Sequence, residues 1–193
     1  MRALLAATVL VVACGGGTAQ PSPTPLRTAA PTVAPILGGT PTASLPCPAV
    51  QPPATKASIE LEKGGVIVIQ LRPDKARCTV GNFVKNARDG KYNGLTFHRV
   101  EPNFVIQGGD PQGTGRGGGD QASEFNDLPF TKGAAGIARA GDPKISNLMQ
   151  FYLCTGSCRH LDGQYTNFGQ ISSGQELADA VKVGDKMKTI RIE

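Results

Sequence analysis

The chain has 193 residues and a formal net charge of +5, with 39% hydrophobic and 18% charged residues. This length favours a single folded domain with a substantial core. The basic residues form no run of the kind that nucleic-acid binding needs, so the composition argues against a nucleic-acid partner.

The N-terminal segment has the features of an export signal. Arg2 precedes an apolar run, Ala3 to Ala13, that is too short for a membrane-spanning helix but suits a secretory signal. The run ends at Cys14 before three glycines, a pattern that looks like a bacterial lipobox. We therefore expect a signal peptide over residues 1–13 and a lipid on Cys14 that anchors the protein to the cell membrane. The alternative is an ordinary cleaved signal and a secreted protein, and both interpretations place the mature chain outside the cytoplasm.

Residues 14–55 are predicted to form a stalk. Ten of the fifteen prolines lie between Pro21 and Pro53, and Arg27 is the one charged residue of the segment. Such a composition cannot bury enough apolar area to offset the entropy of ordering. We expect a disordered, partly polyproline-like stalk that holds a folded domain of residues 56–193 away from the membrane.

The cysteines beyond the lipobox are Cys47, Cys78, Cys154 and Cys158. Four cysteines in an oxidising compartment allow three pairings, and the sequence alone does not choose among them. Cys154 and Cys158 are close enough for a local bridge, and Cys47 with Cys78 would then tie the stalk to the domain. The alternative is that Cys154 is a small buried apolar residue. A metal site of Cys154, Cys158 and His160 lacks a convincing fourth ligand, so we expect no metal.

The first elements of the folded part are a hairpin and a helix. Two β-rich runs, Ser58–Glu62 and Val66–Leu71, flank a glycine turn and predict the hairpin. Apolar residues with helical spacing then predict the helix, with Thr79 as a possible cap and Gly90 as its end. The residues expected on its buried face are Val80, Phe83, Val84 and Ala87.

The later elements are short. Apolar runs separated by glycines extend to about Gly169, and a capping box from Ser173 to Glu176 predicts a second helix that ends at Gly184. Its inward-facing residues are expected to be Leu177, Ala180 and Val181, and a last strand contains Ile190 and Ile192. Many short strands with two well-separated helices predict a mainly β protein, a closed antiparallel barrel whose ends the helices cover.

The stretch from Tyr92 to Asp110 is the most informative. It predicts two strands around a Pro102-Asn103 turn, with alternation placing Val105 and Gln107 on one face and Phe104 and Ile106 on the other. Arg99 and Gln107 are polar residues among apolar strand residues. The structural alternatives are a solvated edge arginine and a buried amide with satisfied hydrogen bonds.

The segment Phe97-His98-Arg99-Val100, followed after a short turn by Phe104-Val-Ile-Gln-Gly-Gly-Asp110, resembles the signature of the cyclophilin family of peptidyl-prolyl isomerases. Companion segments that follow in the family's order are Gly136–Gly141, Gln150–Leu153 and His160–Gly169. The resemblance extends from about Lys63 to Ile192. It implies an eight-stranded antiparallel barrel capped by two helices, a monomer without a cofactor, and proline-containing polypeptides as substrates.

The resemblance also implies the site. The catalytic group would be Arg99, Gln107 and Phe104, with Gln107 bonding the substrate backbone. An apolar pocket for the substrate proline would comprise Phe104, Val105, Tyr152 and Leu161. The remaining substrate-binding residues would be Gln150, which supports the arginine, Ala138 and Arg139, which offer main-chain contacts, and His160 and Tyr165, which close the rim.

The chemistry of prolyl isomerisation agrees with these roles. The barrier of about 18–20 kcal/mol arises from the double-bond character of the C–N bond, and no bond is broken. A permanently charged guanidinium suits stabilisation of the twisted amide better than a titrating group does. We therefore expect His98 to be structural, and the glycine-rich residues 113–119 to form a connecting loop rather than a phosphate-binding loop.

The sequence departs from the family pattern at three places. Leu148-Met149 stands where small residues, often Gly-Ser, are usual, which predicts a change in the groove wall or in the turn that leads to it. His160 stands where many eukaryotic members have tryptophan, which implies weaker binding of cyclosporin-type ligands, and Tyr165 replaces a common histidine. The alternative function is a proline-peptide binding or holdase module with little turnover, which is favoured if Leu148-Met149 obstructs the groove.

Overall fold

The structure, a computed structural model, describes Cys47 and residues 54–193. The predicted signal peptide, Cys14 and nearly all of the predicted stalk lie outside the described residues. The continuous described stretch starts at Ala54, two residues before the predicted domain boundary, and β1 starts at Lys56. Ala54 is only 1% exposed, and the amide of Thr55 donates to the carbonyl of Glu193 at 2.9 Å.

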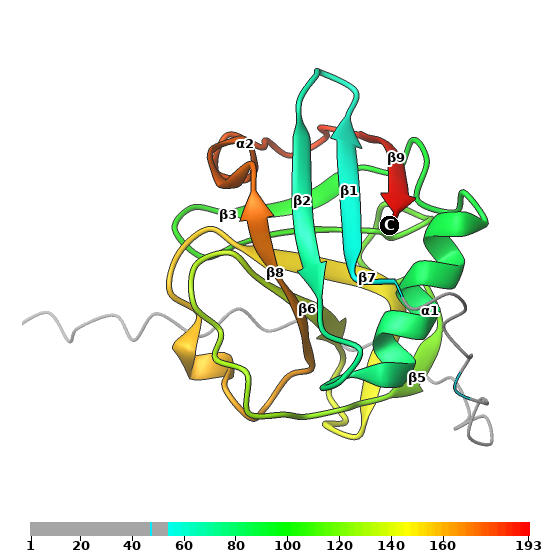
Figure 1. The fold of residues 1–193 in the computed structure, drawn as a ribbon, viewed down its shortest axis with the longest axis vertical. Helices are drawn as coiled ribbons and strands as arrows, with labels where there is room; N and C mark the ends of the chain where they lie inside the picture. The colour runs from blue at the N-terminus through cyan, green and yellow to red at the C-terminus, as the bar shows by residue number, and fades with distance from the viewer. Residues whose placement is uncertain (1–46, 48–53) are drawn as a thin grey trace, which may run out of the picture. The chain divides into compact units, whose positions relative to one another are not determined.

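The described part is mainly β, as predicted, and Figure 1 shows its two α-helices on opposite sides of a curled sheet. The hairpin of the first two strands is confirmed. The elements in chain order are β1 (Lys56–Leu61), β2 (Val66–Leu71), α1 (Arg77–Arg88), β3 (Phe97–Glu101), β4 (Val105–Gly108), β5 (Asp120–Ala122), β6 (Ala134–Arg139), β7 (Ile145–Cys154), the 3-10 helix η1 (Arg159–Leu161), β8 (Asn167–Ser173), α2 (Gln175–Asp179) and β9 (Met187–Ile192). Neither described α-helix has the length and apolar character needed to cross a membrane.

Eight strands form one antiparallel path in the order β3-β4-β7-β6-β8-β2-β1-β9, and β5 pairs with the start of β7. The strands at the two ends of the path, β3 and β9, do not pair as a regular ladder; the ends meet at an isolated bridge between Thr96 and Lys186 and at a few backbone hydrogen bonds around it. The amide of Phe97 adds a bond to the carbonyl of Asp185 at 2.8 Å. The predicted eight-stranded antiparallel sheet is therefore confirmed, but its closure is less complete than a closed barrel implies.

Aromatic residues fill the core between α1 and the sheet. The ring of Phe83 lies 5.3 Å from Tyr92, 5.4 Å from Phe151 and 5.1 Å from Phe168, measured between centroids. All four predicted face residues of α1 are buried, so the helical spacing was interpreted correctly. Side chains alternate along β7, where Phe151 and Leu153 enter this core while Tyr152 and Cys154 point to the other face.

Both predicted helix caps were wrong. Helix α1 begins at Arg77, so Thr79 lies inside its first turn. The amides of Cys78 and Thr79 instead donate to the carboxylate of Glu124, at 3.0 and 2.6 Å, where a negative charge also suits the helix dipole.

The second helix differs in the same way. The predicted capping-box serine, Ser173, belongs to β8, and the N-cap is Gly174 with φ of 81°. The helix has only five residues, so Ala180 lies beyond it and is exposed, while Ala178 is buried. Val181 is buried as predicted, and Leu177 is partly buried.

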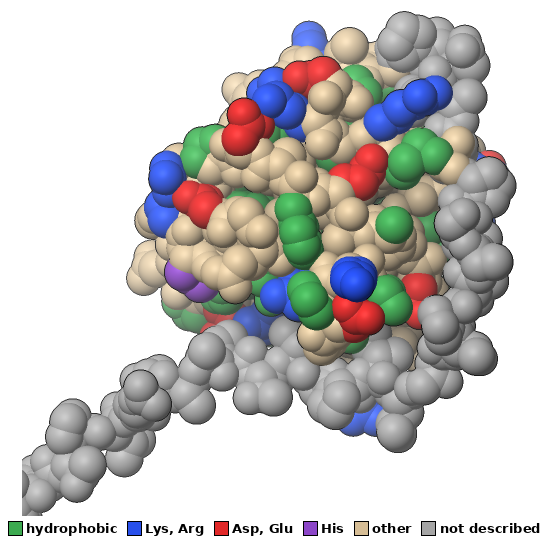
Figure 2. Space-filling view, turned by 90° about the horizontal axis from the view of Figure 1, so that it is seen from below, with side chains coloured by type: hydrophobic (Ala, Val, Ile, Leu, Met, Phe, Trp, Pro, Cys, Tyr) green, Lys and Arg blue, Asp and Glu red, His purple; other side chains and the backbone are tan. Residues whose placement is uncertain are grey.

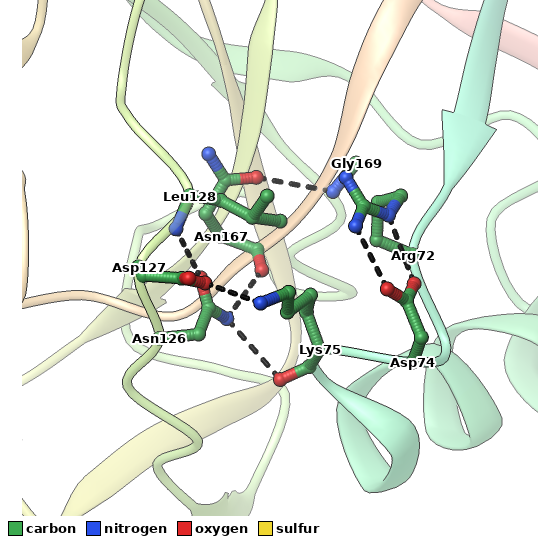
Figure 3. Close-up of polar contacts among 8 residues, drawn as sticks. All are labelled: Arg72, Asp74, Lys75, Asn126, Asp127, Leu128, Asn167 and Gly169. Carbon is green, nitrogen blue, oxygen red and sulfur yellow. Dashed lines mark hydrogen bonds and ion pairs between the residues drawn. The ribbon is translucent and has the colours of Figure 1, made fainter.

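A polar network holds the loop between β5 and β6 against the segment that joins β2 to α1 (Figure 3). Lys75 pairs with Asp127 at 2.7 Å, and the Asn126 side chain donates to the carbonyl of Asn167 at 2.8 Å. The same loop contains Glu124, which caps α1, and leads to Phe130, which is fully buried. This network therefore positions a residue of the site described next.

Candidate active site

A chain of side-chain hydrogen bonds runs from β3 across β4 to β7. Nη1 of Arg99 donates to Oε1 of Gln107 at 3.1 Å, and Nε2 of Gln107 donates to Oε1 of Gln150 at 2.9 Å. Nε2 of Gln150 then donates to the carbonyl of Gly117 at 2.7 Å. Gln107 and Gln150 are both buried. The chain fixes the arginine from one side, and its direct partner is Gln107 rather than Gln150, whose predicted support of the arginine is indirect.

The second terminal nitrogen of the Arg99 guanidinium has no hydrogen-bond partner among the described residues. This nitrogen, Nη2, is buried. The guanidinium carbon lies 5.9 Å from the centre of the Phe104 ring, within the range of a cation–π contact. A buried donor without a partner is unusual in a folded protein. Nε of Arg99 also pairs with the carboxylate of Glu101 at 3.5 Å. Arg99 is therefore oriented by the protein and keeps one unused donor, which another molecule reaches only when a local movement exposes Nη2.

An apolar cluster adjoins this arginine. We call it the groove cluster; its buried members are Val105, Phe130, Ala134, Tyr152, Cys154, Cys158 and Leu161, with Phe104 and Tyr165 partly buried against it. All four residues predicted to form the proline pocket belong to it. It is separate from the aromatic core, which contains Ile106 of the same strand.

Phe104 departs from the predicted alternation. It was expected on the face of Ile106, but it packs with the groove cluster beside Val105. The reason is the turn before it, where Asn103 adopts φ of 58° and the amide of Phe104 bonds the carbonyl of Glu101 at 3.1 Å. The residue lies before the first residue of β4, so the strand period does not apply to it.

The two predicted rim residues lie at the edge of the cluster. His160, in η1, has its ring centre 5.1 Å from that of Phe104. Tyr165 has its ring 6.1 Å from Tyr152, edge to face, and the guanidinium of Arg139 lies 4.4 Å above its face. The apolar cluster thus has aromatic walls and one cationic edge.

Ala138 and Arg139 lie where the ladder between β6 and β7 is irregular. The register shifts between Ile137 and Arg139, so Ala138 is outside the regular pairing. Main-chain groups at such an irregularity can turn toward another chain. Nε of Arg139 donates to the carbonyl of Gln164 at 2.9 Å, so this side chain supports the rim.

The Leu148-Met149 segment is tied to the body of the protein. Met149 is buried in the aromatic core, and its carbonyl accepts the hydroxyl of Tyr92 at 3.1 Å. The carbonyl of Leu148 accepts from the side chain of Asn86 at 3.2 Å. The side chain of Met149 therefore packs in the aromatic core and not in the groove cluster. Of the two residues, only Leu148 can still change the groove wall.

Two polar residues that organise the site were missed from the sequence. Oδ1 of Asn147 accepts the amides of Met149 and Gln150, at 2.9 and 2.7 Å, and its Nδ2 donates to the carbonyl of Gly117 at 2.9 Å. The carboxylate of Asp110 accepts three amides of the glycine-rich loop, those of Gln112, Thr114 and Gly115. Burial alone would raise the pKa of Asp110, but these backbone hydrogen bonds outweigh it and lower the pKa. The loop that presents the Gly117 carbonyl is thus a connecting loop, as predicted, and is ordered by Asp110.

The cysteines resolve the pairing that the sequence left open. Cys47 and Cys78 are joined by a disulfide with an S–S distance of 2.10 Å, whereas Cys154 and Cys158 are free and buried. Sγ of Cys158 donates to the carbonyl of Phe104 at 3.3 Å. A hydrogen bond with Cys158, together with burial, raises the pKa of the Cys154 thiol. The two thiols are therefore packing groups of the cluster, and the local bridge does not form.

Outside this site, the described residues contain no cluster of three or more His, Cys, Asp or Glu residues that could bind a metal ion, and His98 stands alone. His98 is partly buried, its two ring nitrogens have no hydrogen-bond partner, and burial lowers its pKa. Figure 2 shows positive and negative side chains interspersed over one face rather than gathered by sign.

Comparison with known proteins shows which proteins this chain is similar to. The profile of the family described as "Cyclophilin type peptidyl-prolyl cis-trans isomerase/CLD" matches residues 56–193. Peptidyl-prolyl cis-trans isomerase B of Bacillus subtilis is 44% identical over 137 residues, which is 69% of this chain and 94% of the relative. A peptidyl-prolyl cis-trans isomerase of Synechococcus elongatus is 42% identical over 142 residues, covering 72% of this chain and 96% of that protein.

A solved structure of a cyclophilin-type isomerase also has a similar fold. The crystal structure of a Cryptosporidium parvum cyclophilin-type peptidyl-prolyl cis-trans isomerase, in the presence of the dipeptide Ala-Pro, superimposes with a TM-score of 0.65. Its sequence is 26% identical, and the match covers 72% of this chain and 98% of that chain. The similarity spans nearly the whole described domain, including every predicted site residue except Cys14.

Proposed function

The chain belongs to the cyclophilin family of peptidyl-prolyl cis-trans isomerases, and we propose that it rotates Xaa-Pro bonds by stabilising the twisted amide with Arg99 beside the groove cluster. Isomerase activity is the function of the family. The proposal concerns the arginine, the pocket and the kind of chain that is used. The substrates we propose are exported or unfolded polypeptides with accessible prolines.

The observation that carries this mechanism is the free donor of Arg99. Its Nη1 is held by Gln107 at 3.1 Å, while its Nη2 is buried without a partner. When the amide twists, its nitrogen loses conjugation and can accept a hydrogen bond, which the planar amide nitrogen does not. Once a bound chain exposes this donor, the arginine is already held by Gln107 and needs little further reorganisation, and one such donor typically contributes about 2.7–4 kcal/mol.

The groove cluster supplies the second part of the mechanism. Phe104 is the partly exposed apolar residue beside the arginine, and we expect a proline ring to pack against it, over the cluster that contains the buried Val105 and Tyr152. Burial of that ring excludes water from the reacting amide. The arginine lies at the edge of this cluster, 5.9 Å from the Phe104 ring centre. A proline bound there therefore brings its own nitrogen close to the guanidinium. Binding energy from the ring then holds the bond where the donor can act.

Met149 bears on the alternative of a binding module with little turnover. That alternative depended on obstruction of the groove by Leu148-Met149, and the side chain of Met149 packs in the aromatic core instead. This packing of Met149 supports an enzyme that turns over its substrate rather than a module that only binds it.

The proposal is tested by measuring the rate of cis–trans exchange of the Ala-Pro bond in a short peptide by magnetisation-transfer NMR. With the peptide in large molar excess, a catalyst accelerates cis–trans exchange of the whole pool, whereas a binding module affects only the bound fraction. We expect exchange well above the uncatalysed rate, which corresponds to tens to hundreds of seconds. Exchange at the background rate would show that the chain binds proline peptides without isomerising them.

We also propose that the enzyme acts outside the cytoplasm while anchored through a lipid on Cys14. The support is the sequence pattern at residues 1–17 and the Cys47–Cys78 disulfide, since disulfides persist mainly in oxidising compartments. Cells are labelled with a fatty-acid analogue and the wild type is compared with Cys14→Ser. Loss of label in the variant is expected, and retained label would exclude Cys14 as the modified residue.

A further inference from the structure

The chain carries Xaa-Pro bonds that lie close in sequence to the domain. Ten prolines precede Lys56, and the nearest Ala-Pro dipeptide on the N-terminal side of Cys47 is Ala34-Pro35. Eleven residues, 36–46, separate Pro35 from Cys47. The question is whether the link between them allows this dipeptide to reach the groove.

The attachment point of the segment lies near the rim of the groove. The Cys47–Cys78 disulfide fixes the segment to the start of α1. The amide of Cys78 donates to the Glu124 side chain at 3.0 Å, and the amide of Glu124 donates to the Thr166 hydroxyl at 2.8 Å. Thr166 is the neighbour of the rim residue Tyr165. These links place Cys78 no more than about 20 Å from Tyr165.

The length of the link selects among the prolines. An extended polyproline chain advances about 3.1 Å per residue, so the link from Cys47 to Pro35 reaches up to roughly 37 Å. Pro46 and Pro48 adjoin Cys47 in the sequence, so their links extend only about 3 Å. The link to Pro41 extends to about 19 Å, which just matches the upper limit of about 20 Å for the distance from Cys78 to Tyr165. Prolines farther from Cys47 than Pro35 have longer links, and a longer link dilutes the ligand it carries.

We propose that Ala34-Pro35 is an intramolecular ligand of the isomerase groove and competes there with polypeptide substrates. This inference rests on the proposed function, because the same pocket and arginine bind both. The segment suits the site, since it is uncharged from Thr28 to Pro53 and the dipeptide itself lies among the apolar residues Val33 to Leu37. A ligand on a short link has an effective concentration of roughly millimolar, so it competes even if its intrinsic affinity is weak.

The exchange rate of the Ala34-Pro35 bond in the full-length protein tests the proposal, with Leu45-Pro46 in the same spectrum as the matched control. We expect exchange at Pro35 to be much faster than the tens to hundreds of seconds of an uncatalysed bond, while Pro46 stays at that slow rate. The Pro35 rate should not depend on protein concentration. Equal slow exchange at both bonds, or a rate that rises with concentration, would overturn the proposal.

Kinetics with an added Ala-Pro peptide provide a second test. Pro35→Ala is combined with Pro31→Ala, because Pro31 forms the next Ala-Pro dipeptide of the segment. The double variant removes the competitor, so the KM for the added peptide should fall about two-fold or more with kcat unchanged, whereas Pro46→Ala should match the wild type. All of these substitutions lie outside the folded domain, and a free-thiol assay confirms that the disulfide of Pro46→Ala is intact. Equal KM values in all three proteins overturn this inference alone. No acceleration by any of them would overturn the proposed function as well.

Discussion

Arg99 and Gln107 are direct partners across the antiparallel pair of β3 and β4, where Nη1 of the arginine donates to Oε1 of the glutamine at 3.1 Å. The partnership depends on a register shift between Phe97 and Arg99. A bulge of this kind redirects a side chain relative to the regular ladder. The orientation of the arginine is therefore built into the strand pairing and extended by the bonds from Gln107 to Gln150 and Gly117.

Gln150→Ala tests whether this chain of bonds positions the arginine. The substitution leaves the buried amide of Gln107 without its acceptor, a loss of about 1–3 kcal/mol. We expect kcat/KM to fall about ten-fold, mainly through kcat, because Gln107 and Arg99 lose their fixed orientation. Gln112→Ala, at an exposed loop position, serves as the control. Unchanged kcat in a folded Gln150→Ala protein would contradict the positioning role.

Tyr152→Phe tests the role of the aromatic ring without its hydroxyl. The hydroxyl is buried and has no hydrogen-bond partner among the described residues, and burial raises the pKa of Tyr152 well above its usual value. Removing an unsatisfied hydroxyl relieves a desolvation cost. We expect an unchanged or higher melting temperature and isomerase activity close to that of the wild type. A large loss of activity would mean that the hydroxyl itself contacts the substrate.

Gly136→Ala tests the close packing beneath the groove cluster. A methyl group at Gly136 would collide with the phenol ring of Tyr152 and approach Phe130 to 2.7 Å. Overpacking of this kind typically costs about 1–3 kcal/mol, and here it also displaces a pocket residue. We expect lower stability and a raised KM. Gly141→Ala, where a methyl group meets no atom within 4 Å, should match the wild type.

Asp110 gives a pH dependence of stability with a definite sign. Its pKa is below the ordinary value of 3.8 because the backbone hydrogen bonds outweigh the effect of burial. Because the pKa of Asp110 is lower in the folded state than in the unfolded state, its ionisation stabilises the fold at any pH above the ordinary pKa of 3.8. That stabilisation is lost as the pH falls from 3.8 through the folded-state pKa. Denaturant titrations of the wild type and Asp110→Asn should therefore diverge at neutral pH and converge in acid. Asp120→Asn, at an exposed position of β5, is the control. A constant difference at all pH values would contradict this account.

Local patterns predicted those features whose causes are local. The spacing of Val80, Phe83, Val84 and Ala87 predicted the buried face of α1, and the motif around Arg99 led to the site. Tyr152 and Phe151 lie on opposite faces of β7, and the strand period holds there because that strand is long and paired on both sides. Phe104 escaped the same rule because the left-handed residue Asn103 precedes it.

The features that the sequence did not reveal depend on distant partners. The start of α1 is capped by Glu124, which is 46 positions from Cys78, so no short window contains both groups. Asn147 organises the approach to Gln150 through the carbonyl of Gly117, 30 positions away. The choice of Cys47 with Cys78 likewise followed from the fold, since three pairings satisfied the sequence.

The most direct test of the central claim compares Ala-Pro exchange by the wild type, Arg99→Ala, Arg99→Lys and Arg191→Ala. Arg191 is an exposed arginine of β9 paired with Glu60, and its removal should leave the rate unchanged. Arg99→Ala should lower kcat/KM by about 10²–10³, and Arg99→Lys should recover little, because an ammonium cannot bond Gln107 and the substrate with the same planar fork. A folded Arg99→Ala protein that isomerises the peptide at the wild-type rate would contradict the claim that this arginine carries the catalysis.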